Sequence, residues 1–156
     1  VNLADYLPID SFEHVATGPF THLYPKKGYT ETAYKILKKV PHISVYRKSE
    51  LPARLHFGSS PRIGELVLIA DLGTQIFFRP QGIPKDFLHA GHGFDNKNPE
   101  MYAIFKAVGP DFQPGRKVSK PIPNITLYPL VCRILGLQPG THDADEALAS
   151  SLLKKK

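Results

Sequence analysis

The sequence predicts an α/β fold, and three observations lead to this prediction. The chain has 156 residues, of which 42% are hydrophobic, and this is enough to bury a core of globular-domain size. Within residues 12–78, short apolar segments typical of strands surround one segment with the periodicity of an amphipathic helix. Residues 101–108 are apolar nearly throughout, as expected of a strand that is buried on both faces.

Five strands are predicted in the first half of the chain. Glycine, proline and aspartate residues, which favour turns, bound most of them. Gly18 and Pro19 join the first two strands, and residues 71–73 are expected to turn the last two into a hairpin. Two strands, one helix and three further strands suggest a small mixed sheet. The predicted strands are residues 12–17, 20–24, 42–46, 66–70 and 74–78.

One helix is predicted for residues 30–40. Thr30 is expected to cap its amino end, and Glu31 suits the first turn because the helix dipole favours a negative charge there. Pro41 ends the helix. The apolar positions that line one side are Ala33, Ile36, Leu37 and Val40.

The second half of the chain is predicted to contain a loop and two helices as well as the strand at residues 101–108. The loop covers residues 79–88, and a helix over residues 126–135 ends at Gly136 in a left-handed cap. A final helix is expected to begin at Asp143. Cys132 is expected to be a buried small hydrophobe. The predicted core stripe of the first helix is Leu127, Leu130, Val131, Ile134 and Leu135.

His92 lies between Gly91 and Gly93, on backbone that can turn tightly and approach a ligand closely. Neutral imidazole is a common zinc ligand and needs an acceptor to orient its ring, a role that Asp95 or Asn96 suits. The alternative is a simple turn in which these two side chains bind local backbone. Spacing alone favours the turn, because zinc needs three or four ligands.

Four segments along the chain carry a resemblance to a known family. They are residues 46–57 (YRKSELPARLHF), 61–63 (PRI), 91–96 (GHGFDN) with 101–110 (MYAIFKAVGP), and 127–136 (LYPLVCRILG). In this order they resemble the nucleotide pyrophosphatase/phosphodiesterase family of the alkaline phosphatase superfamily. The segment around His92 is similar to the one that supplies a late zinc-binding histidine in that family, and residues 127–136 are similar to its final core helix.

The resemblance implies that the chain is the C-terminal part of an alkaline-phosphatase-like core that carries a small inserted α+β subdomain. Residues 1–11 are then a core fragment and residues 12–80 the inserted subdomain. Residues 81–156 return to the catalytic core with the metal-ligand loop, the buried strand and two helices.

The resemblance also implies a site with two zinc ions, one of them bound by His92. Asp95, Asn96 and His89 are expected beside this ligand, and an ion pair of Asp95 with Arg62 is expected to orient the loop. The family's threonine or serine nucleophile and its other zinc ligands are expected upstream, so no catalytic residue is assigned in this chain. The isolated segment is expected to be inactive.

The implied function is zinc-dependent hydrolysis of phosphodiester or pyrophosphate bonds through a covalent threonine intermediate. The implied partners are a nucleotide or other phosphodiester substrate and the missing N-terminal half of the same enzyme. No apolar run is long enough to cross a membrane. The family implies an extracytoplasmic location, periplasmic or secreted, and the single cysteine favours a bacterial relative over the disulfide-rich animal ones.

Two other functions remain open. One is a related hydrolase of the same superfamily, of the phosphonoacetate or choline-phosphodiester type. The other is a non-catalytic polyanion-binding module, because residues 14–62 hold nine Lys or Arg against two acids in a chain of net charge +6. Specific nucleic-acid binding is not expected, because no nucleic-acid-binding motif accompanies the charge.

Overall fold

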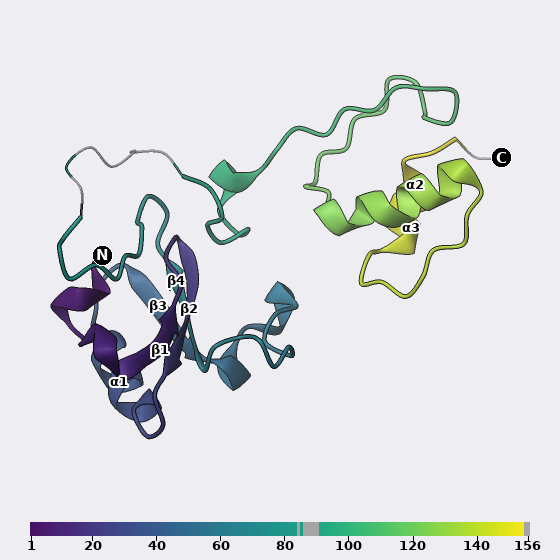
Figure 1. Ribbon diagram of the computed structural model, residues 1–156. Coiled ribbons are helices and arrows are strands. Elements are labelled where there is room, and N and C mark those ends of the chain that lie inside the picture. Colours follow the sequence, from purple (N-terminus) through teal and green to yellow (C-terminus); the bar gives the residue numbers. More distant parts are fainter. Residues whose placement is uncertain (84, 86–90, 155–156) are drawn as a thin grey trace. The chain divides into compact units, whose positions relative to one another are not determined.

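A four-stranded antiparallel sheet organises the first part of the chain in the computed structural model, which describes residues 1–83, 85 and 91–154 (Figure 1). The strands are β1 (Phe12–Val15), β2 (Phe20–Pro25), β3 (Ile43–Arg47) and β4 (Leu66–Ala70), in the order β1-β2-β4-β3. These four strands were predicted. The expected mixed sheet is wrong, because all three pairings are antiparallel.

Internal contacts divide the described residues into an N-terminal unit, Val1–Met101, and a C-terminal unit, Tyr102–Lys156. Each unit has a hydrophobic core of its own. The predicted boundaries after residues 11 and 80 refer to the layout of a whole enzyme and stay a prediction.

The core of the N-terminal unit lies around β4, in which all five residues are buried. On one face the sheet packs against α1 (Thr30–Leu37) and the amino-terminal segment. On the other face Val67 lies opposite His22 and Tyr46, and Ile69 lies opposite Phe20. A strand covered on both faces explains the continuous apolar run. The fully buried side chains of the first face include Leu3, Leu23, Ala33, Leu37, Leu66 and Leu68.

The helix α1 begins differently from the prediction. Tyr29 occupies the N-cap position, and Thr30 is the first helical residue. The Thr30 hydroxyl donates to the Glu65 carboxylate and is therefore not a cap. After Leu37 the chain tightens into one more turn, in which the Val40 N–H binds the Leu37 carbonyl at 3.0 Å. Pro41 then prevents further helix.

The predicted hairpin of residues 66–70 and 74–78 is wrong. The turn itself forms, with the Thr74 N–H bound to the Asp71 carbonyl at 2.9 Å. However, the chain then leaves β4: Ile76 bridges Gly18, and Phe77 bridges Asn2. The turn chemistry was local and visible, whereas the pairing partners lie more than fifty residues earlier.

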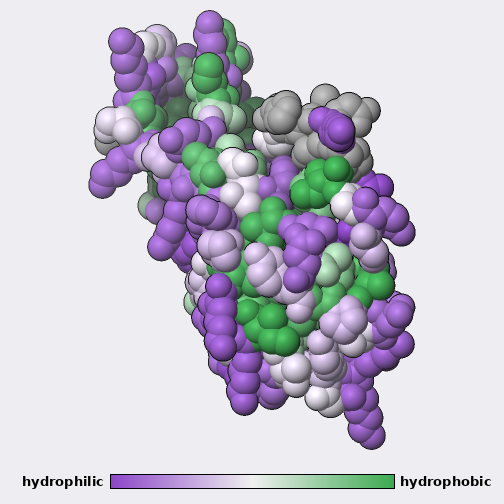
Figure 2. Space-filling model, turned by 90° about the vertical axis from the view of Figure 1, so that its left-hand side faces the viewer, coloured by the Kyte–Doolittle hydropathy of each residue, from purple (hydrophilic) through white to green (hydrophobic). Residues whose placement is uncertain are grey.

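Short 3-10 helices complete the described residues, and none of the described helices is long and apolar enough to cross a membrane. On the face of the N-terminal unit shown in Figure 2, hydrophobic residues remain in view among hydrophilic ones. The 3-10 helices are η1 (Leu3–Asp5), η2 (Ile9–Ser11), η3 (Lys48–Glu50), η4 (Ala53–Leu55), η5 (Pro99–Met101) and η6 (Asn124–Thr126).

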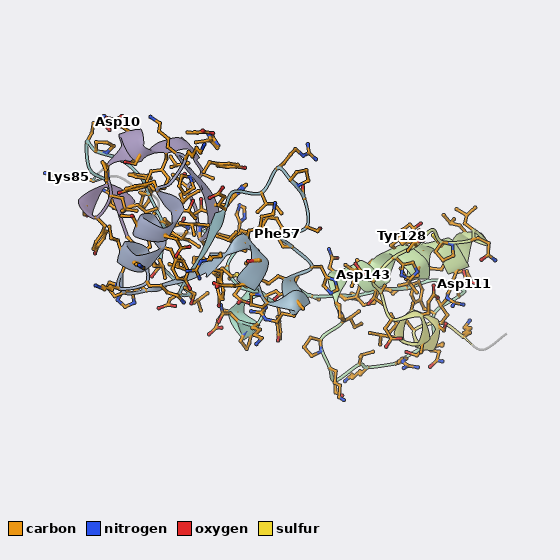
Figure 3. The ribbon with its side chains drawn as sticks, turned by 90° about the horizontal axis from the view of Figure 1, so that it is seen from below. Asp10, Phe57, Lys85, Asp111, Tyr128 and Asp143 are labelled. Atoms are coloured by element: carbon orange, nitrogen blue, oxygen red, sulfur yellow. The ribbon has the colours of Figure 1, made fainter. Side chains whose placement is uncertain are left out.

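The C-terminal unit is built on two helices, α2 (Leu127–Leu135) and α3 (Glu146–Ser151). As predicted, Gly136 ends α2 in the left-handed conformation with φ 68°, and Cys132 is buried. The loop between the helices is pinned by Tyr128, labelled in Figure 3, whose hydroxyl accepts the Gly140 N–H at 2.9 Å. The small core that the helices share comprises Leu130, Ala149 and Leu152.

The amino-terminal cap of α3 is Asp145 and not the predicted Asp143. The Asp145 carboxylate accepts the N–H groups of Ala147 and Leu148 at 2.8 and 3.1 Å. Two aspartates, Asp143 and Asp145, precede this helix, and sequence position alone did not decide which of them caps it.

Two further expectations for this unit are wrong. Residues 102–108 form no strand, and Ile104 and Val108 are 95% and 86% exposed. A strand buried on both faces needs neighbours on both sides, and none of the described strands pairs with this segment. Val131 and Leu135, assigned to the core stripe of α2, are 50% and 63% exposed.

Candidate functional site

The loop of residues 91–98 carries His92 and has no helix or strand. His92 is exposed, and within the described part of the chain its imidazole has no hydrogen-bond partner. Gly93 adopts a φ of +87°, which L side chains rarely adopt. At Gly91 a Cβ would lie 2.4 Å from the Gln75 amide nitrogen. The two glycines thus serve a tight turn and a close approach, as their positions suggested.

Arg54 holds the carboxyl side of this loop. Its guanidinium donates to both carboxylate oxygens of Asp95, at 2.9 and 2.5 Å, and to the Asn96 side-chain oxygen at 3.0 Å. The Arg54 and Asp95 side chains are only 31% and 20% exposed. A planar fork that meets a carboxylate with two parallel hydrogen bonds fixes orientation as well as distance.

Local backbone bonds shape the rest of the loop. The Asp95 carboxylate also accepts the Lys97 N–H at 2.9 Å, and the Asp95 carbonyl accepts the Asn98 N–H at 3.0 Å. The alternative prediction, that Asp95 binds local backbone in a turn, is therefore confirmed. Asp95 makes this turn and binds Arg54 at the same time.

The ion pair shifts the protonation equilibria of both groups. The hydrogen bond from Arg54 is the largest of the effects that hold the pKa of the Asp95 carboxyl below its usual value. The same hydrogen bond raises the pKa of the Arg54 guanidinium. Asp95 therefore stays ionised near neutral pH, which keeps the loop bound to Arg54.

Arg62, the partner expected from the sequence, does not make this bond. Its carbonyl instead accepts the Tyr24 hydroxyl at 2.5 Å. Arg54 lies 41 residues before Asp95, and no local pattern connects the two. The sequence contained one indication that Arg54 and Asp95 belong together. Residues 46–57, which contain Arg54, and residues 91–96 both carry the resemblance to the same family.

The sheet positions Arg54 through the segment that follows β3. The 3-10 helix η4 ends at His56, which takes a left-handed conformation with φ 47°. The next residue, Phe57, is labelled in Figure 3, and its ring packs edge-on against Phe20 of β2, with centroids 5.2 Å apart. Further along, the Gly64 N–H donates to Nδ1 of His22 at 3.0 Å. The segment is thus fastened to one face of β2 at two points.

One exposed imidazole is the only predicted metal ligand that the structure describes. His89 lies outside the described residues. Nowhere in residues 1–83, 85 and 91–154 do three His, Cys, Asp or Glu side chains gather as a metal-binding group. Since zinc takes three or four protein ligands, the described residues do not by themselves form a zinc site, and the metal role of His92 stays a prediction.

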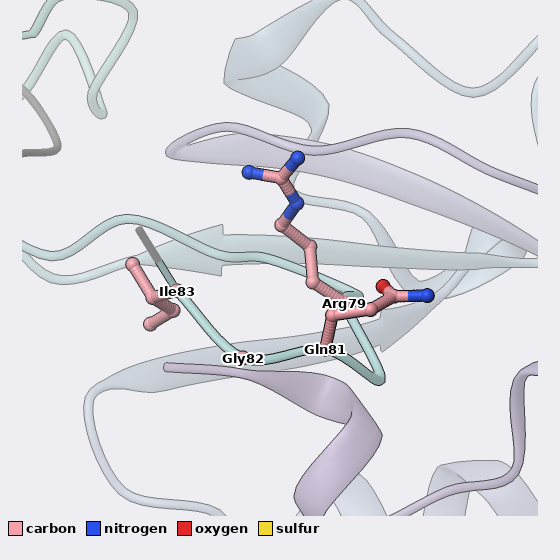
Figure 4. Close-up of a pocket in the computed structure, with 4 residues that line it drawn as sticks. All are labelled: Arg79, Gln81, Gly82 and Ile83. Carbon is pink, nitrogen blue, oxygen red and sulfur yellow. The ribbon is translucent and has the colours of Figure 1, made fainter. Parts of the chain in front are cut away.

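A shallow hollow lies apart from these residues. It is lined by Arg79, Gln81, Gly82 and Ile83 (Figure 4). The Asn2 side chain binds the backbone N–H and carbonyl of Arg79, each at 3.0 Å, and so fixes one wall. The hollow contains none of the site residues expected from the sequence.

Comparison with known proteins assigns the chain to a family. Residues 1–95, which include Arg54, His92 and Asp95, match the family described as type I phosphodiesterase / nucleotide pyrophosphatase. The chain belongs to this family. The resemblance inferred from the sequence is therefore confirmed.

Relatives in the family match most of this chain. Mouse ectonucleotide pyrophosphatase/phosphodiesterase family member 7 is 35% identical over 144 residues, which are 92% of this chain and 32% of the relative. Bovine bis(5'-adenosyl)-triphosphatase is 36% identical and covers 89% of this chain and 30% of its own length. The chain thus spans about a third of the length of the curated relatives it matches.

Solved structures of the family confirm the α/β fold. Human ectonucleotide pyrophosphatase / phosphodiesterase 5 matches with a TM-score of 0.87 and 31% identity, over 99% of this chain and 41% of that chain. An inactive variant of the murine protein, in complex with AMP, matches with a TM-score of 0.88 and 31% identity, over 99% of this chain and 40% of its own.

Proposed function

We propose that this chain is the C-terminal segment of a zinc-dependent nucleotide pyrophosphatase/phosphodiesterase. In this proposal the enzyme hydrolyses phosphodiester or pyrophosphate bonds through a covalent intermediate on a threonine outside this chain. The segment contributes His92 as one ligand of one of two zinc ions. The observation that carries the proposal is an exposed imidazole on an anchored loop, in a chain of this family.

The residues of this chain have a limited part in the chemistry. The neutral imidazole of His92 would donate a ring nitrogen lone pair to the metal. Arg54, Asp95 and Asn96 hold the loop that carries it. When bound, paired zinc ions offset the negative charge that develops on the attacking and leaving oxygens of an in-line displacement.

Two relatives support a nucleotide as the substrate. The bovine relative is named a bis(5'-adenosyl)-triphosphatase, and the murine structure holds AMP. A related hydrolase of the phosphonoacetate or choline-phosphodiester type stays the alternative. Turnover of a nucleotide ester compared with that of a choline phosphodiester by the complete enzyme would separate the two.

An extracytoplasmic location and a partner segment are also part of the proposal. Family members 5 and 7 among the relatives carry the prefix "ecto" in their names, which supports the location. In the C-terminal unit, exposed apolar residues such as Ile104, Val108 and Leu135 offer a surface for the remaining part of the enzyme.

The polyanion-binding alternative is weakened by the internal pairing of three of the nine basic residues in 14–62. Arg47 binds Glu31 and Glu50, Arg54 binds Asp95, and the Lys48 ammonium donates to the Ser60 carbonyl. Side chains that already hold acceptors within the fold contribute less to an anion-binding surface.

Zinc content and turnover test the proposal. In the complete enzyme, His92→Ala should lower the zinc content by one ion and reduce kcat/KM for a nucleotide nitrophenyl ester by about 100-fold or more. His14→Ala, which removes another exposed histidine, should change neither. The isolated 156-residue chain should show no turnover. Full zinc content in the His92→Ala enzyme, or zinc-dependent turnover by the isolated chain, would contradict the proposal.

A further inference from the structure

Among the described residues, contacts with the rest of the N-terminal unit hold the loop of residues 91–98 on both sides of His92. Before it, Gly91 lies against the side chain of Gln75 so closely that a Cβ would collide with the amide. After it, the Arg54 guanidinium binds Asp95 and Asn96. The position of the His92 backbone is thus defined from both ends.

The two contacts differ in strength and direction. Gly91 and Gln75 only touch, whereas Arg54 makes three charge-assisted hydrogen bonds. The bonds within the turn, from Lys97 and Asn98 to Asp95, fix the shape of the turn but not its place on the unit. Among the described residues, Arg54 makes the side-chain hydrogen bonds that place the turn relative to the sheet.

We propose that Arg54 is a positioning residue for His92, which acts by clamping Asp95 and Asn96 and thereby presents the imidazole at the place and angle that the metal requires. This inference rests on the proposed zinc role of His92. Groups that orient a metal ligand without touching the metal commonly change metal affinity by about 10- to 100-fold when they are removed.

An arginine is suited to this role and a lysine only partly. The guanidinium offers several donors in a fixed plane and reaches the carboxylate and the amide oxygen together, whereas an ammonium is a point charge. Arg54→Lys should therefore retain the attraction to Asp95 and lose the defined geometry, so that its effect falls between wild type and Arg54→Ala.

The matched control is Arg47, another arginine of the N-terminal unit that binds two acidic side chains, Glu31 and Glu50. Neither acid belongs to the loop of His92. Arg47→Ala therefore removes a comparable ion pair and reports any general loss of stability. Asp95→Asn removes the charge from the other side of the clamp with little change in volume, and serves if Arg54→Ala fails to fold.

Two measurements on the complete enzyme test the inference. The first is amide hydrogen exchange of residues 95–101 without metal, and the second is the zinc dissociation constant from competition with a chromophoric chelator. Arg54→Ala and Asp95→Asn should speed exchange in this segment and weaken zinc binding by about 10- to 100-fold. Arg54→Lys should have a smaller effect, and Arg47→Ala none on either measurement.

The outcomes separate this inference from the proposed function. Unchanged exchange or unchanged zinc affinity in Arg54→Ala, while His92→Ala abolishes binding of one zinc ion, would overturn the positioning role alone. Equal losses of zinc affinity in Arg54→Ala and Arg47→Ala would overturn it as well. Full zinc binding by His92→Ala would overturn the proposed function, and the positioning role with it.

Discussion

Nδ1 of His22 accepts the backbone N–H of Gly64 at 3.0 Å and so ties β2 to the loop that precedes β4. The Tyr24 hydroxyl lies 3.2 Å from the same nitrogen. A nitrogen that accepts a hydrogen bond must carry a free lone pair, so the bond from the Gly64 N–H favours the neutral imidazole of His22. Burial, and secondarily the charge of nearby His14, lower the pKa of His22.

The His22 contact predicts a loss of stability in mild acid. Because the folded-state pKa lies below the ordinary value of 6.5, the unfolded chain binds the proton more readily. The contribution of the neutral His22 imidazole to folding stability is therefore complete above pH 6.5 and is lost as the pH falls below 6.5. His22→Asn keeps an acceptor at a similar place and does not titrate. Thermal unfolding between about pH 8 and pH 5 should show a smaller decline for this variant. An identical decline would contradict the assignment.

Gly64 is predicted to be far less tolerant of a side chain than Gly91. A Cβ at Gly64 would lie 2.3 Å from the carbonyl oxygen of Leu23, which is backbone of a buried strand and cannot move away. At Gly91 the obstacle is the flexible end of Gln75. Gly64→Ala should cost about 1 to 3 kcal/mol of unfolding free energy in urea titrations, and Gly91→Ala distinctly less. Equal costs would show that the Leu23 contact is not restrictive.

The ionised Asp95 carboxylate is expected to cause a second loss of stability, at lower pH than the one due to His22. Its pKa is lowered in the folded state, so its contribution is present above the usual value of 3.8 and is lost as the pH falls below it. Asp95→Asn should cost about 1 kcal/mol at neutral pH. The variant should also flatten the acid limb of a stability profile recorded by circular dichroism. An unchanged acid limb would show that Arg54 does not hold the ionised form.

Asp145 is predicted to stabilise the C-terminal unit as a helix cap. Its carboxylate accepts two of the free N–H groups at the start of α3. Asp145→Ala should lower the unfolding free energy by about 1 kcal/mol, whereas Asp145→Asn should have little effect, because asparagine caps equally well. Equal stabilities of the alanine and asparagine variants would remove this role from Asp145.

The sequence was a good guide wherever one segment decides its own structure. The run of residues 66–70 predicted β4, and Gly136 predicted the end of α2, because alternation, apolar runs and glycine caps act locally. The caps assigned to Thr30 and Asp143 were local errors, whereas the wrong hairpin has a different cause. Ile76 and Phe77 chose partners near the amino terminus, and no local pattern encodes that choice.

In the candidate site too, local features could be inferred from the sequence and a contact between distant segments could not. The tight turn and close approach at Gly91 and Gly93 were inferred from three adjacent letters of sequence, and the turn at Asp95 from its composition. The metal role of His92 stays a prediction. Arg54 was missed in favour of Arg62. Both arginines lie in the same stretch between β3 and β4, and only the folded segment decides which guanidinium reaches the carboxylate.

The span of 41 residues between Arg54 and Asp95 has a consequence for the order of assembly. Contacts so distant in sequence close a large loop, and that entropic cost is met only once β4, the strand between the two residues, has paired. The loop that carries His92 is therefore expected to take its final place on the sheet late, once that scaffold exists. In small zinc modules the ion drives the chain to fold. Under the zinc role that we propose for His92, an ion would instead bind a molecule that has finished folding.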